Sequence, residues 1–205
     1  MKNLKLVLSG IGLSAVMLLT ACGNEVEKVD YAHGTVEGNK FSSTMFGLTA
    51  EFDDNWTFAS EDELAAMNGI SDMSVDSTNS AFSSTGLVYD MYVGTEEGSN
   101  VSFIVEDLSK TNNSSLDEQG YVDASYPSLQ SQLEAQGFTV ENIEKTTVTF
   151  AGAETPCVKI DLSIMGINAY EYQVYKKAGQ YMGVITITGM SKGEPEELAG
   201  KFKAL

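Results

Sequence analysis

The side chains that most often carry out catalysis are scarce in this chain of 205 residues. It has one His, two Cys, one Trp and no Arg, beside 12 Lys and 29 Asp plus Glu. A catalytic metal centre needs several converging ligands, usually with His among them, and His33 is the single histidine. A phosphate-binding loop needs a Gly-rich turn followed by Lys-Ser or Lys-Thr, which the chain lacks. We therefore expect a protein without a metal, a cofactor or catalytic residues.

The first 22 residues have the features of an export signal. Lys2 and Lys5 form a basic start, and residues 6–19 are apolar but too short to span a membrane. The run ends in Leu-Thr-Ala-Cys at residues 19–22, which resembles the lipobox of bacterial lipoproteins. The resemblance implies that signal peptide 1–21 is removed and that Cys22 carries fatty-acyl chains such as palmitate. Two acyl chains hold a protein on a bilayer far longer than one.

The charge of the chain restricts its partners. Removal of residues 1–21 leaves 10 Lys against 29 acidic residues, and a polyanionic backbone would be repelled, so we expect no nucleic-acid partner. Residues 22–40 are polar and rich in Gly and acid, without helical or strand periodicity, which predicts the anchor Cys followed by a flexible tether. Residues 41–205 then form one domain.

Cys157 lies in a strand-like run. With Cys22 acylated it has no partner for a disulfide bond. A reactive thiolate needs a nearby base or cation, and the one His is expected in the tether. We expect Cys157 to be an inert packing residue, with a reactive thiol as the alternative.

The first half of the domain is expected to contain short strands and one helix. Residues 46–52 alternate as a strand, and Ser60 with Glu63 predicts a capping-box helix that Asn68-Gly69 ends. Residues 71–85 are mostly Ser, Thr, Asp and Asn, which predicts an irregular surface loop. Residues 87–93 and 101–105 are expected to pair as a hairpin.

The second half predicts a helix, a β-meander and a closing helix. Apolar residues share one face of a helix over residues 117–136, with Pro127 either kinking it or dividing it in two. Alternation and short turns then predict antiparallel strands at 140–150, 158–164, 170–176 and 181–188. The final helix opens at Glu194-Pro195, and we expect Leu198, Phe202 and Leu205 to form its buried stripe.

Several of these segments resemble the Mog1/PsbP-like family, in particular its bacterial lipoprotein branch. The resembling residues lie at 46–52 with Trp56, 61–67, 101–106, 148–152, 172–175 and 181–188. The resemblance implies an α+β fold, a central antiparallel β-sheet flanked by α-helices (an α/β/α sandwich). Its members are accessory subunits and binding modules rather than established enzymes, and none of the resembling residues forms a catalytic motif.

Three groups of residues remain as candidate ligand sites. Acidic clusters at Asp53, Asp54 and Asn55 and at Glu96, Glu97 and Asn100 offer oxygen ligands, but neither has the spacing of a known calcium loop, so solvated turns are expected. The aromatic residues in or beside strands are expected to be core, with sugar or peptide binding as the alternative: Trp56, Tyr89, Tyr92, Tyr170, Tyr172, Tyr175 and Tyr181. Four residues share one polar face of a predicted strand, and the sequence leaves open whether that face is exposed to solvent, covered by a helix or part of a groove: Cys157, Lys159, Asp161 and Ser163.

The sequence as a whole predicts a lipoprotein on the extracytoplasmic face of the cell membrane, attached through Cys22. Its domain is expected to be a non-catalytic binding or accessory module with an envelope protein or glycan as possible partner; the residues do not identify the ligand. Two alternatives remain. One is a carboxylate-dependent hydrolase of an envelope or dietary polymer, which requires two buried acids with raised pKa in a cleft. The other is a small-solute capture lipoprotein, which requires a pocket.

Overall fold

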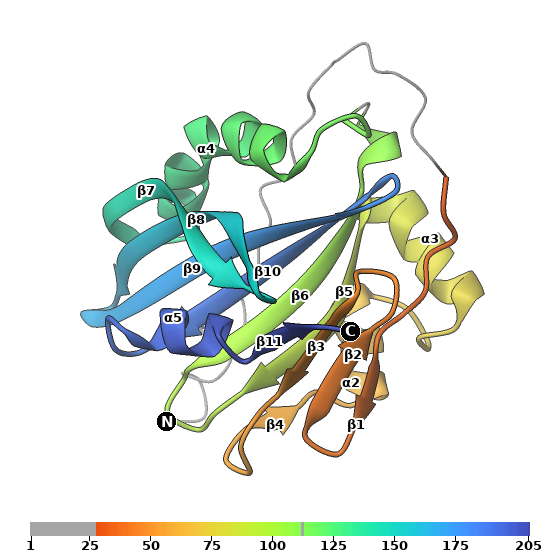
Figure 1. The fold of residues 1–205 in the computed structure, drawn as a ribbon, viewed down its shortest axis with the longest axis horizontal. Helices are drawn as coiled ribbons and strands as arrows, with labels where there is room; N and C mark the ends of the chain where they lie inside the picture. Colours follow the sequence, from red (N-terminus) through yellow and green to blue (C-terminus); the bar gives the residue numbers. More distant parts are fainter. Residues whose placement is uncertain (1–27, 112) are drawn as a thin grey trace.

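A computed structural model describes residues 28–111 and 113–205, which form two antiparallel β-sheets and a few helices (Figure 1). The larger sheet has the order β4-β5-β6-β10-β9-β8-β7. Its strands are β4 (Thr57–Phe58), β5 (Leu87–Gly94), β6 (Asn100–Asp107), β7 (Thr139–Phe150), β8 (Ala153–Ile164), β9 (Ile167–Ala178) and β10 (Tyr181–Gly189). The smaller sheet has the order β1-β2-β3-β11, with β1 (Thr35–Glu37), β2 (Lys40–Ser43), β3 (Leu48–Glu51) and β11 (Phe202–Ala204). The α+β class is confirmed.

The helices lie on both sides of the larger sheet. They are α2 (Glu61–Asn68), α3 (Val75–Thr85), the 3₁₀ turn η1 (Leu108–Lys110), α4 (Glu118–Ala135) and α5 (Glu194–Ala199). Helix α4 packs against β7, β8 and β9 on one face. The other face is covered by the smaller sheet, with α3 and α5 beside it (Figure 1). A second sheet therefore takes much of the place that the sandwich prediction gave to helices.

Two apolar cores result from strand alternation, which sends successive side chains to opposite faces. Phe41, Phe103 and Ile185 belong to the core between the two sheets, and Leu129 and Val184 belong to the core beneath α4. The predicted meander is confirmed as β7 to β10, which are joined by tight turns. At the first turn Ala151 and Gly152 both have positive φ, 51° and 81°, as the twist of a two-residue hairpin requires.

The structure corrects the prediction for residues 71–85. From Val75 to Thr85 they form helix α3, which Ser74 caps by accepting a hydrogen bond from the Ser77 backbone N–H, and which ends at Gly86 with φ 77°. The helix is held by the burial of Phe82, whose ring contacts Tyr31 at 5.0 Å between centroids.

The closing helix is also shorter than predicted. Helix α5 ends at Ala199, and Phe202 then belongs to strand β11, paired with Ala50 of β3. The Phe202 ring lies 4.6 Å from that of Phe150, between centroids, in the core between the sheets. Leu205, expected in the buried stripe, is 61% exposed. Packing between the sheets therefore outweighs the helical spacing of these apolar residues.

Two further predictions concern helix α4 and the residue at which the domain begins. Helix α4 is a single helix that contains Pro127 rather than two helices. The predicted tether is wrong from Val29 onward: the backbone N–H and C=O of Val29 bond the side chain of Gln180, both at 2.9 Å, and β1 begins at Thr35. The domain therefore starts about a dozen residues before residue 41. None of the helices in the described ranges is long and apolar enough to cross a membrane.

Candidate functional site

Six polar side chains form two neighbouring rows on the α4 side of the larger sheet. Thr188 of β10 pairs with Asn100 of β6 and with Glu171 of β9, and two residues along β10 Thr186 pairs in the same way with Ser102 and Gln173. Directly paired residues share a face, as do residues two apart along a strand. We call this set the polar layer: Asn100, Ser102, Glu171, Gln173, Thr186 and Thr188.

Strand alternation places the polar layer on one face. Ile185 and Ile187 alternate with Thr186 and Thr188 and point into the core between the sheets. Tyr175 and Val184 form the next row, two residues along the same strands from Gln173 and Thr186, and they lie in the core beneath α4. The polar layer therefore continues that second core across β9, β10 and β6, whereas α4 itself packs on β7, β8 and β9.

The polar layer is buried and only partly hydrogen-bonded. None of its six residues is more than 3% exposed. Gln173 Nε2 donates to Glu171 Oε1 at 2.7 Å, and the Tyr175 hydroxyl donates to Gln173 Oε1 at 3.0 Å. Ser102 Oγ, Thr188 Oγ1 and Glu171 Oε2 have no hydrogen-bond partner in the described parts of the chain. A buried polar group without a partner costs about 1–3 kcal/mol, so these three adjacent oxygens need partners from outside the chain, which are either ordered water or a bound molecule.

Burial also changes the acidity of Glu171. Loss of water raises the pKa of its carboxyl to about 8, and the hydrogen bond from Gln173 opposes only part of that rise. Glu171 therefore carries a proton at neutral pH. A protonated carboxyl donates one hydrogen bond through its O–H and accepts others.

A second buried acid lies on the same face but far from the first. Burial raises the pKa of Glu106 to about 7, against a hydrogen bond that it accepts from the Tyr121 hydroxyl. Glu106 pairs with Met182, whereas Glu171 pairs with Thr188. Six residues along a strand and two strands across place the carboxyls more than about 20 Å apart. Paired-carboxylate glycosidases need about 5–10 Å, so these two acids do not form such a pair.

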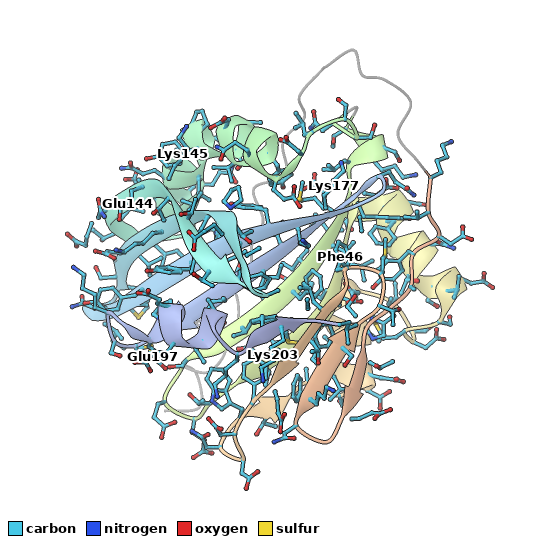
Figure 2. All side chains as sticks on the ribbon, in the orientation of Figure 1. Phe46, Glu144, Lys145, Lys177, Glu197 and Lys203 are labelled. Atoms are coloured by element: carbon cyan, nitrogen blue, oxygen red, sulfur yellow. The ribbon has the colours of Figure 1, made fainter. Side chains whose placement is uncertain are left out.

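The polar strand face containing Lys159 contributes to a groove on the opposite side of the sheet. Lys159 Nζ lies 3.4 Å from Glu144 Oε1, and with Tyr172 and Glu196 they line a space of about 300 Å³. Glu144 and Lys145 are neighbours on β7 (Figure 2), and strand alternation sends their side chains to opposite faces, where Lys145 Nζ bonds Asp123 of α4 at 2.8 Å. The groove is lined by charged and hydroxyl groups that largely pair with one another, as Glu154 does with Thr147 and Thr149.

The structure places the other candidate residues from the sequence in different environments. Cys157 is buried in the core between the sheets, as the packing interpretation predicts, and burial raises the pKa of its thiol to about 12. Asp53 Oδ2 pairs with Lys201 Nζ at 2.9 Å, and Asn100 belongs to the polar layer. The described residues contain no cluster of three or more His, Cys, Asp or Glu that would hold a metal ion. Cys22 lies outside the described residues.

The aromatic candidates are divided between core and margin. Tyr172, Tyr175 and Tyr181 are buried, as the core interpretation predicts. Tyr92 and Tyr89 are half-buried, and they pair with Ser102 and Ile104 on the α4 side of the sheet. They therefore extend the face that carries the polar layer toward the edge at β5.

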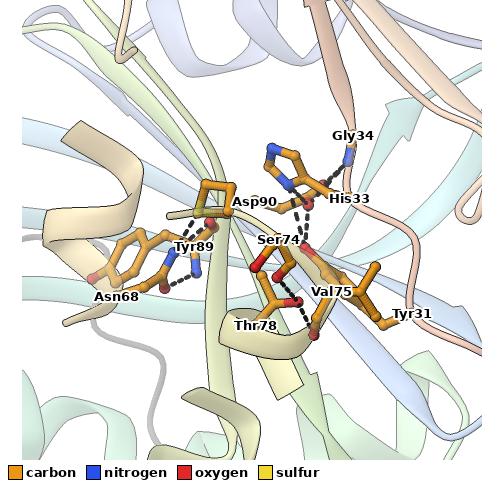
Figure 3. Close-up of polar contacts among 10 residues, drawn as sticks. Tyr31, His33, Gly34, Asn68, Ser74, Val75, Thr78, Tyr89 and Asp90 are labelled. Atoms are coloured by element: carbon orange, nitrogen blue, oxygen red, sulfur yellow. Dashed lines mark hydrogen bonds and ion pairs between the residues drawn. The ribbon is translucent and has the colours of Figure 1, made fainter. Parts of the chain in front are cut away.

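His33 belongs to a buried network rather than to a tether (Figure 3). Asp90, the bulged residue of β5, accepts hydrogen bonds from the Tyr31 hydroxyl, from His33 Nδ1 at 2.6 Å and from the Gly34 backbone N–H at 3.1 Å. Burial would lower the pKa of His33, but the hydrogen bond and charge of Asp90 outweigh it and raise that pKa. A Cβ on Gly34 would lie 2.3 Å from the ring of Phe41, so only glycine fits this close approach.

One Gly-x-Ser-x-Gly pattern was missed at the level of sequence: Gly189-Met190-Ser191-Lys192-Gly193, between β10 and α5. Its spacing and its strand–turn–helix setting fit the nucleophile elbow of serine hydrolases. However, Ser191 does not have the positive φ of a strained elbow. Its hydroxyl lies 3.5 Å from Glu194 Oε2, while His33 is bonded to Asp90. The pattern therefore has no positioned histidine base.

Comparisons with known proteins give a likeness at the level of shape. The solution structure of cyanobacterial PsbP (CyanoP) from Synechocystis sp. PCC 6803 is similar with a TM-score of 0.47 and 14% identity, over 91% of this chain and 99% of that one. A crystal structure from Bacteroides thetaiotaomicron VPI-5482 is similar with a TM-score of 0.37 and 12% sequence identity. The match covers 83% of this chain and 49% of that protein, so this chain spans about half of its length. No family model matches, and no curated protein sequence matches. Likeness at this level gives no function.

Proposed function

We propose that this chain is a bacterial cell-envelope lipoprotein, anchored through Cys22 on the extracytoplasmic face of the membrane, whose Mog1/PsbP-like domain is a non-catalytic binding module. The observation that supports binding is the polar layer, with three adjacent buried oxygens left without a partner. A binding site offers such groups to a ligand, whereas a purely structural core satisfies them internally.

The anchor part of the proposal rests on the lipobox and on the attachment of Val29 to Gln180. Val29 follows Cys22 by seven positions, which places the domain within about 25 Å of the lipid at full extension. The domain would then work close to the membrane rather than at the end of a long tether.

Membrane attachment is tested by fractionating cells that express the full chain or the Cys22→Ser variant. We expect the full chain in the membrane pellet and the variant in the soluble extracytoplasmic fraction, because the acyl chains on Cys22 are the expected anchor. A variant that stays with the membrane would contradict the anchor.

Binding at the polar layer is tested by thermal unfolding of the protein purified from membranes, against a library of small solutes. A ligand at 100 times its dissociation constant stabilises the folded state by about 2.7 kcal/mol, which raises the Tm by several degrees for a domain of this size. The control is the double variant Ser102→Ala, Thr188→Val, which removes two of the unpartnered hydroxyls. A ligand of the polar layer must lose its stabilisation in this variant.

A further inference from the structure

The chemistry of the polar layer narrows the ligand beyond the proposed binding function, on which this inference rests. The six side chains span three strands and two rows, about 10 Å by 7 Å from strand spacing and rise. This extent of polar groups matches the size of one small ring rather than of a polymer segment.

Among residues 28–111 and 113–205, no cation is placed to hold an anion at the polar layer. Two lysines lie on the same face of the sheet, and both are bonded elsewhere: Lys145 Nζ to Asp123 of α4, and Lys177 Nζ to the Ser114 carbonyl at 2.6 Å. An anionic ligand would therefore bury its charge without a partner, which is costly.

The groups without a partner also suit a neutral ligand better than a cation. Two of them are hydroxyls, which both donate and accept, and the third belongs to a carboxyl that burial keeps protonated at neutral pH. Among the described titratable groups, Tyr175 and Cys157 interact electrostatically with Glu171, and burial raises the pKa of both and so keeps them neutral. The polar layer thus offers mixed donors and acceptors with no net charge.

Apolar and aromatic side chains border the polar layer. The next row across the sheet consists of Tyr89, Ile104, Val184 and Tyr175, and Tyr92 continues the row of Ser102 toward β5. Sugar rings present hydroxyls at their edges and C–H groups on their faces, and binding sites for such solutes combine a few placed polar groups with apolar walls.

We propose that the polar layer binds a neutral polyhydroxylated solute of the size of one sugar ring. Its hydroxyls pair with Ser102 Oγ, Thr188 Oγ1 and Glu171 Oε2, and its C–H face packs toward Ile104 and Val184. Each ligand hydroxyl can accept from one of these groups and donate to another, so all three gain partners without any charge being buried.

The test uses four probes that share one ring and differ in charge: D-glucose and N-acetyl-D-glucosamine are neutral, D-glucosamine is cationic and D-glucuronate is anionic. Calorimetric titration of the protein purified from membranes at pH 7 is expected to show binding of a neutral probe and at least tenfold weaker binding of the charged ones. The double variant Ser102→Ala, Thr188→Val is expected to weaken the neutral probe at least tenfold.

The dependence on pH gives an independent readout. The carboxyl loses its proton above about pH 8, so wild-type affinity for the neutral probe should fall about tenfold between pH 7 and pH 9. Glu171→Gln keeps a neutral donor, so it should bind at pH 7 within a few-fold of wild type and show no such fall. Glu141→Gln, an exposed acid on β7, is the matched control and should behave as wild type.

The outcomes separate the two levels of the proposal. Binding of glucosamine or glucuronate alone, lost in the double variant, would overturn the neutral-solute inference and leave the polar layer as a binding site. Binding of a neutral probe that the double variant does not weaken would place the solute elsewhere and overturn the inference. If no neutral probe binds, the inference is wrong. If no member of the solute library depends on Ser102 and Thr188, the proposed binding function fails as well.

Discussion

Glu171→Gln should make the protein more stable at alkaline pH, because the wild-type carboxyl is buried where its charged form is disfavoured. Its pKa rises from 4.5 to about 8 on folding, so the unfolded chain loses this proton several pH units earlier than the folded one. Wild-type stability therefore falls as pH rises from about 4.5 to about 8 and then levels off. The substitution keeps the shape and the bond from Gln173 and removes this dependence.

The magnitude follows from the change in pKa. One pKa unit is worth about 1.4 kcal/mol, so the full change corresponds to about 5 kcal/mol, and relaxation around the buried charge lowers it. We expect the variant to exceed wild type by about 2–5 kcal/mol in free energy of unfolding at pH 8 and by less than about 1 kcal/mol at pH 5. Urea denaturation without added solute, at both pH values, measures this difference, with Glu141→Gln as control. An equal effect at both pH values, or a loss of stability at pH 8, would refute the reasoning.

Three further predictions concern the buried network and the buried thiol. Asp90→Asn should lower the free energy of unfolding by about 3–5 kcal/mol, because the amide turns a donor toward the Gly34 N–H and removes the charge that faces His33; a loss under about 1 kcal/mol in urea denaturation would contradict the network. His33→Gln should cost more stability at pH 5.5 than at pH 8.5. The pKa of His33 is raised on folding, so its contribution to the free energy of unfolding is complete below the ordinary pKa of 6.5 and disappears as the pH rises through the folded-state pKa. Equal losses of stability at the two pH values would contradict this. Cys157 should not react with a thiol reagent in native protein at pH 8 and should react once urea unfolds the chain, since its pKa is about 12; rapid native reaction would show an accessible thiolate.

The meander could be predicted because its signals are local. Alternation along residues 140–188 and the short turns at Ala151-Gly152 and Met165-Gly166 give both strand identity and antiparallel pairing. The capping box at Ser60 and Glu63 is equally local, and it forms as predicted.

The elements that were missed depend on distant partners. Helix α3 is poor in good helix formers, and although Ser74 and Gly86 are local cap signals, its packing depends on Phe82, whose ring contacts the distant Tyr181 and Tyr31. The stretch before residue 41 lacks periodicity because it is fixed by Asp90 and Gln180, which lie 57 and 151 residues away from their partners. No local pattern contains that information.

The polar layer could be predicted only in part from the sequence. Thr186 and Thr188 alternate with Ile185 and Ile187, so their shared face follows from the sequence. That Glu171 lies beside Thr188 follows from the register of β9 and β10 alone. The available signal was a carboxylate in the middle of an aromatic strand, a position where an acid is seldom found without a partner.

The central claim is tested most directly by a crystal structure of the protein grown with the neutral sugar that stabilises it most. The account predicts a sugar ring over β6, β10 and β9, with its hydroxyls within about 3.2 Å of Ser102 Oγ, Thr188 Oγ1 and Glu171 Oε2. If these three oxygens instead bond ordered water or protein atoms only while the sugar lies elsewhere, the polar layer is structural and the claim is wrong.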